Sequence, residues 1–134
     1  LTRHDLPHGF LVSDLDFRLS FPDGQKRLYT FEYHRVPRIA DIMTELERHL
    51  YALLHGVISS DYKHPHSNLV LSVYEHSSAM QSVLERLATW HKFQPDQSSF
   101  KFAVLDDLRA DFQKSWLSFS GSEVASADFC ALEG

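Results

Sequence analysis

The sequence lacks several of the residue patterns on which recognisable functions depend. Its single cysteine, Cys130, cannot form a disulfide within the chain, and this thiol usage suits a reducing cytoplasm. The five glycines form no glycine-rich loop, which argues against a backbone cradle for nucleotide phosphates. The apolar runs are far shorter than the ~20 residues that cross a bilayer. We therefore expect a cytoplasmic protein without a disulfide framework, a nucleotide-binding loop or a membrane span.

Basic residues are also scarce. Lysine and arginine number 13 against 18 acidic residues, and the formal net charge is −5. Proteins that follow a phosphate backbone normally carry a basic excess, so no extended nucleic-acid surface is expected. The length of 134 residues suits one domain, because two independent cores would each be too small to be stable alone, and the 43% of apolar residues supply ample core material. The predicted organisation is a leader over residues 1–13, with an optional short strand, one domain over 14–120 and a loose tail over 121–134.

Strict alternation of apolar and polar residues predicts a β-hairpin at the start of the domain. One run covers residues 14–21 and the next covers residues 27–36, and a turn containing proline, aspartate and glycine joins them. In the second run Tyr29, Phe31 and Tyr33 form one face, which we interpret as the face buried in the core.

Helical and strand-like segments then follow in turn. Apolar residues at the helical period predict a first helix, and Ser78 with Gln81 forms a capping box that predicts the start of a second one. Apolar spacing predicts a third helix after residue 105, with an edge strand at 116–119 as the alternative. The expected elements are a helix at 38–55, a strand at 69–74, a helix at 78–93 and a strand at 100–104.

The element order is β-β-α-β-α-β-α, which predicts an α+β domain. Right-handed crossovers would make the second, third and fourth strands parallel, with the first strand antiparallel to the second. We expect a two-layer sandwich with about four strands in a mixed sheet and the helices mainly on one face. A ferredoxin-like arrangement with antiparallel returns is the alternative.

This order gathers polar residues at one sheet edge, where the parallel strands end. Open α/β sheets usually bind ligands at that edge. Three of these residues are candidates for acid–base catalysis, and three more are candidates for anion binding near helix N-termini. The alternative is that they are polar because loops face water. The catalytic candidates are His34, His76 and Asp107, and the anion-binding candidates are Arg35, Arg38 and Ser78.

A second candidate is a histidine pair in the loop before residue 68. His64 and His66 flank a proline, which favours an extended backbone and places both imidazoles on the same side. Zn²⁺ or another divalent metal needs at least a third protein ligand, for which His55 is the nearest histidine. The alternative is an ordinary pair of surface histidines.

One motif bears a partial resemblance to a catalytic pattern. Pro22-Asp23 with Glu32-Tyr33-His34 resembles the Pro-Asp…Glu-x-Lys pattern of restriction-endonuclease-like nucleases, in which the two acids hold Mg²⁺. Here Asp23 falls in a tight turn and His34 replaces the lysine, so we attach no function to the match.

Without a specific motif, composition favours a non-catalytic protein-interaction or regulatory module, such as a small accessory, inhibitor or immunity-like protein. Its partner would be another protein or a second copy of the chain, and no cofactor is expected. Aromatic residues that exceed the needs of the predicted core, and are therefore expected to be exposed, support this interpretation. The alternative is a small metal-dependent or His/Asp-using enzyme with its site at the sheet edge. The aromatic residues in question are Tyr62, Tyr74, Trp90 and Phe129.

Overall fold

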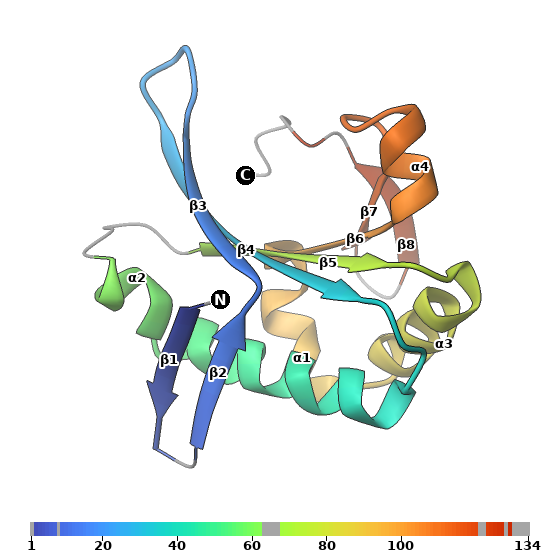
Figure 1. Ribbon diagram of the computed structural model, residues 1–134, viewed down its shortest axis with the longest axis horizontal. Helices are drawn as coiled ribbons and strands as arrows, with labels where there is room; N and C mark the ends of the chain where they lie inside the picture. Colours follow the sequence, from blue (N-terminus) through green and yellow to red (C-terminus); the bar gives the residue numbers. More distant parts are fainter. Residues whose placement is uncertain (1, 8, 63–67, 121–122, 128, 130–134) are drawn as a thin grey trace.

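The predicted hairpin forms one edge of a mixed sheet that extends through the domain (Figure 1). A computed structural model describes residues 2–7, 9–62, 68–120, 123–127 and 129, without the side chains of 94–96. The strands are β1 (Thr2–Leu6), β2 (Gly9–Ser13), β3 (Leu15–Ser20), β4 (Lys26–His34), β5 (Asn68–Tyr74), β6 (Phe100–Val104), β7 (Trp116–Ser120) and β8 (Glu123–Ala127). The helices are α1 (Ile39–Leu54), α2 (Val57–Asp61), α3 (Ser77–Ala88), the 3₁₀ helix η1 (His91–Ser99) and α4 (Leu105–Ala110).

Among the described residues, six strands form the main sheet in the order β3-β4-β5-β6-β7-β8. β3 is antiparallel to β4, and β4, β5 and β6 are mutually parallel. This confirms the mixed α+β class and the parallel arrangement of the three middle strands. It contradicts the ferredoxin-like alternative and the four-strand count, because β7 and β8 extend the sheet by two antiparallel strands.

The C-terminal part of the domain differs most from the prediction. The third helix does not continue to residue 116, because α4 ends at Ala110. The Asp111 carboxylate accepts hydrogen bonds from the backbone N–H groups of Gln113 and Lys114. This local turn replaces the backbone hydrogen bonds that would continue the helix. Trp116 then begins β7. That strand is not at the edge of the sheet, because β8 pairs with it inside the segment predicted as a loose tail.

Helices cover both faces of the sheet, although unequally (Figure 1). α1, α3 and η1 pack on one face, around side chains such as Phe93, Phe102 and Leu46. α4 lies over the other face, where Trp116 and Phe129 pack against Tyr29. The helix predicted at 38–55 is confirmed as α1. No helix in the described part of the chain combines the length and the apolar character needed to cross a bilayer.

The predicted start and end of the second long helix are both displaced. α3 begins at Ser77, so Ser78 lies inside the helix, and the N-cap residue His76 makes no side-chain capping bond. The capping-box prediction is therefore wrong. α3 ends at Ala88 instead of near Phe93, and the 3₁₀ helix η1 places the Phe93 ring in the core between Phe100 and Phe119.

The predicted leader forms a second, two-stranded sheet. β1 and β2 pair as an antiparallel hairpin that lies beside α1 and α2 in Figure 1. Leu11 from this hairpin is buried together with Leu28, Ala52 and Ile58. Residues of both strands, Leu6 from β1 and Leu11 from β2, therefore contribute to a buried cluster with the rest of the chain.

A buried histidine attaches this hairpin to the rest of the molecule. The His4 side chain is 1% exposed, with Nε2 at 2.8 Å from Asp16 Oδ2 and Nδ1 at 2.6 Å from Asp61 Oδ2. The Tyr62 hydroxyl donates a third hydrogen bond, of 2.7 Å, to Asp16 Oδ2. β1 is thus linked by one imidazole to β3 and to the end of α2.

We predict that His4→Leu destabilises the protein by about 3–5 kcal/mol, because it leaves the buried Asp16 carboxylate without its main partner. Arg3→Ala is the matched control, since the neighbouring Arg3–Asp5 pair is exposed and its loss costs less than about 1 kcal/mol. Urea unfolding measures both changes, and amide exchange of β1 and β2 reports loosening of the hairpin. Equal losses for the two variants would contradict the account.

Candidate metal-binding site

A polar layer lies between β4 and α1, where an apolar core would be expected. Alternation along β4 directs Thr30 and Glu32 toward the helix side, and both are buried. The opposite face carries Tyr29, which is fully buried, with Phe31 and Tyr33 partly buried. The interpretation of the tyrosine face as the core face is thus only half correct, because both faces of β4 are covered.

α1 supplies the partners of Glu32. Glu45 and His49 are four residues apart, so they lie one turn apart on the same face of the helix. A buried hydrogen bond of 2.9 Å joins His49 Nε2 and Glu32 Oε1. One potential ligand atom from each of Glu32, Glu45 and His49 lies within 4.8 Å of the other two. A central strand and a long helix therefore bring two carboxyl groups and an imidazole together.

The electrostatics of this cluster disfavour charge on its members. Burial, followed by the neighbouring Glu45 and Asp14 carboxyl groups, raises the pKa of Glu32 to about 9. Burial, reinforced by His34, lowers the pKa of His49 to about 3. At neutral pH the buried pair is therefore a protonated carboxyl group and a neutral imidazole.

Two further residues complete the surroundings of the cluster. Asp14 Oδ2 accepts a 2.7 Å hydrogen bond from the backbone N–H of Tyr33, which holds this carboxylate beside β4. Burial lowers the pKa of His34 to about 4, so its imidazole is also neutral. Two buried ring nitrogens, His34 Nε2 and His49 Nδ1, lack a hydrogen-bond partner within the described residues. Unpaired buried polar atoms of this kind call for a missing polar partner, such as water or an ion.

The cluster opens to solvent through a surface pocket of about 420 Å³. Asp14, Glu32, His34 and Glu45 contribute to its wall, and their carboxyl and imidazole groups are typical ligands of divalent metals. The other lining residues are Val12, Tyr33, Arg35, Val36, Arg38, Asp41 and Ile42.

The arrangement fits a metal ion geometrically. Ligand atoms that bind one Zn²⁺ at about 2.1 Å lie at most about 4.2 Å apart, so the observed 4.8 Å limit requires only small side-chain adjustments. Three protein ligands leave coordination positions open, as in catalytic metal sites. The residues present can therefore hold a divalent ion that remains accessible from the pocket.

The predicted sheet-edge residues divide between two places. His34, Arg35 and Arg38 all line the pocket. His76 and Asp107 do not line it; both are exposed, the first as the N-cap residue of α3 and the second on α4. Ser78, in the first turn of α3, is also exposed and away from the pocket lining. The proposed roles of these residues remain predictions.

The predicted histidine-pair site is only partly described. His64 and His66 lie outside the described residues. His55, its predicted third ligand, is exposed at the C-terminal end of α1, where its ring packs on Tyr51 with 4.2 Å between the ring centres. Metal binding by this loop stays a prediction.

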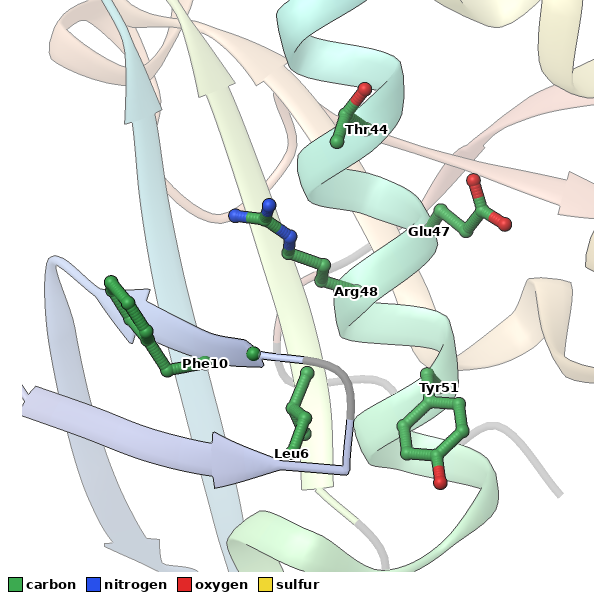
Figure 2. A pocket seen from close by; sticks show the side chains of 7 residues that line it. Leu6, Phe10, Thr44, Glu47, Arg48 and Tyr51 are labelled. Carbon is green, nitrogen blue, oxygen red and sulfur yellow. The ribbon is translucent and has the colours of Figure 1, made fainter.

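A second pocket, of about 230 Å³, lies where the turn of the β1–β2 hairpin faces α1. Figure 2 shows Leu6 and Phe10 from the hairpin opposite Arg48 and Tyr51 from α1, and the Arg48 side chain extends toward the hairpin. The residues that line this pocket include neither a histidine nor a buried carboxyl group. This pocket therefore lacks the potential metal ligands that line the first pocket.

No protein-family model, curated protein or solved structure matches the chain. Its chemistry is therefore inferred from its own residues.

The residues of the cluster left only weak signals in the sequence. Glu45 and His49 have the i, i+4 spacing of a helical ligand pair. In the sequence, however, Glu45 belongs to the polar positions expected on the solvent-exposed face of the helix. Glu32 stood out only within the partial nuclease pattern. The Asp23 of that pattern is exposed in the turn before β4 and is not a member of the cluster.

We predict that metal-free protein, kept in chelator, loses stability as the pH rises from 7 to 9. Folded Glu32 keeps its proton up to about pH 9, whereas the unfolded chain releases it above its ordinary pKa of 4.5. The folded state therefore binds more protons in this window, and stability falls by up to about 1.4 kcal/mol per pH unit. Urea unfolding at several pH values measures this slope. Glu32→Gln removes the titrating group, so parallel profiles for the two proteins would refute the assignment.

Proposed function

We propose that this protein binds one divalent metal ion through Glu32, Glu45 and His49. The observation that carries the proposal is the convergence of three potential ligand atoms within 4.8 Å, where two of the three residues, Glu32 and Glu45, also line an open pocket. The ion would retain open positions facing the pocket, where it can polarise a bound ligand or activate water. This corresponds to a small metal-dependent enzyme.

The cost of the cluster in the absence of an ion supports the proposal. Glu32 is 4% exposed, and its carboxyl group lies beside two other acids. Burial and these neighbours disfavour the ionised form of Glu32, as its raised pKa indicates. A bound cation reverses the sign of these interactions, because it favours the ionised carboxylates that the empty cluster disfavours. Functional sites commonly carry such perturbed groups.

The ligand types indicate a class of ion. Two carboxylates and one imidazole suit Mn²⁺, Fe²⁺ or Zn²⁺ better than Ca²⁺, which prefers oxygen ligands alone. With no cysteine in the cluster, selection for a soft, thiolate-binding ion is not expected. Mn²⁺ is therefore a suitable experimental probe.

The interaction or regulatory role inferred from composition also remains a prediction. Its positive support was an excess of exposed aromatic residues, and the structure contradicts that premise for two of them: Tyr74 is fully buried and Phe129 is 5% exposed. Trp90 packs against the main core, and Tyr62 packs against the Leu11 cluster and Asp16.

We predict that the protein binds one equivalent of Mn²⁺, measured by isothermal titration calorimetry and by the loss of the free Mn²⁺ electron paramagnetic resonance signal. Glu45→Gln and His49→Ala each remove one ligand and weaken binding by more than about tenfold. Glu45 is half-buried, so its variant is expected to fold normally, and circular dichroism checks this.

Glu47→Gln is the matched control, because Glu47 lies on the same helix and is exposed outside the pocket. Its Mn²⁺ affinity should equal that of the unmodified protein. The proposal fails if the unmodified protein binds no Mn²⁺, or if Glu45→Gln and Glu47→Gln bind it equally well.

A further inference from the structure

Two arginines share the pocket with the proposed metal ligands. Arg35 follows β4 and Arg38 is the N-cap residue of α1, and both line the pocket. Both are exposed, and neither guanidinium makes a hydrogen bond or salt bridge with another residue in the described part of the chain. The planar, multiply donating guanidinium group matches oxyanions, which makes this pair available for an anionic ligand.

The other charges of the pocket define where an anion can bind. Glu32 and Glu45 would be offset by the divalent ion, while Asp14 is engaged by the backbone N–H of Tyr33. Asp41 lies in the first turn of α1, where a carboxylate interacts favourably with the helix dipole. An anion therefore finds its attractive partners at the ion and at the two guanidinium groups.

Two independent features support a ligand at this place. The N-cap residue of α1 supplies no side-chain capping bond, so the first N–H groups of this 16-residue helix lack a side-chain acceptor at its start. The His49 side chain is 1% exposed and its Nδ1 has no partner within the described residues, and neither has the buried Nε2 of His34 in the pocket wall. The start of α1, the His34 imidazole and the two arginines border one pocket, and His49 is hydrogen-bonded to Glu32, which also lines it.

We propose that this pocket binds a phosphate monoester, whose phosphoryl oxygens bridge the metal ion and the guanidinium groups of Arg35 and Arg38. The inference rests on the proposed metal site and specifies its ligand. A phosphoryl group has three terminal oxygens and can contact one ion and two guanidiniums together, whereas a carboxylate has only two oxygens. The volume of about 420 Å³ lies in the range that accommodates a small organic ligand as well as the phosphoryl group.

The test uses Mn²⁺-loaded protein and three probes: inorganic phosphate, phenyl phosphate and benzoate. Calorimetry gives their affinities, and Mn²⁺-enhanced ³¹P relaxation reports whether phosphorus lies beside the ion. We expect both phosphates to bind, phenyl phosphate more tightly, and benzoate to bind at least about tenfold more weakly. The double variant Arg35→Gln/Arg38→Gln should weaken phosphate binding by about tenfold or more and leave Mn²⁺ affinity unchanged.

Arg86→Gln is the matched control, because Arg86 is exposed on α3 and is not among the residues that line this pocket. Its phosphate and Mn²⁺ affinities should both be unchanged. The inference is overturned if Mn²⁺-loaded protein binds neither phosphate, if the double variant binds them as tightly as the unmodified protein, or if benzoate binds equally well. In each of these cases Mn²⁺ binding would persist. Failure of the metal site itself is recognised separately, as absence of Mn²⁺ binding before any anion is added.

Discussion

The contact between Glu32 and His49 is the constraint on which the rest of the structure depends. It is a buried polar bond between the second strand of the main sheet and the longest helix, at a position where most domains of this class place apolar side chains. Burial and nearby acids raise the pKa of Glu32 and keep it protonated, whereas burial and the neighbouring His34 lower the pKa of His49 and keep it neutral. A layer of this kind costs stability compared with an apolar core, which is why its presence points to a function.

The surrounding fold is arranged around this layer. On one side, α1, α3 and η1 form an aromatic-rich core with β5, β6 and β7. On the other side, the β1–β2 hairpin packs next to α1 and is attached through His4 to Asp16 and Asp61. The polar cluster thus lies between a rigid core and a hairpin held by a few buried polar bonds. Such an arrangement positions ligands firmly while leaving one side open as a pocket.

The sequence predicted those parts of the fold that depend on periodicity. Alternation located β3 and β4, the helical period located α1, and the order of elements gave the parallel strands. The prediction from periodicity failed where local hydrogen bonds or distant strand partners determine the secondary structure. Hydrogen bonds to Asp111 end α4, and the strands β7 and β8 depend on pairing with the sheet. For the site, chain order indicated the end of β4, and His34, Arg35 and Arg38 line a pocket there, while their roles stay predictions. The sequence analysis missed Glu45 and His49, because a polar residue that faces a buried polar layer produces the same sequence periodicity as a polar residue that faces water.

The most direct test of the metal-centre account is an anomalous-difference map from crystals of the protein grown with Mn²⁺. The account predicts one strong peak within about 2.3 Å of a carboxylate oxygen from each of Glu32 and Glu45 and of a ring nitrogen of His49. That peak should face the pocket that Arg35 and Arg38 line. A map with no peak between these three side chains, and with His49 Nε2 still bonded to Glu32 as its only partner, would contradict the central claim.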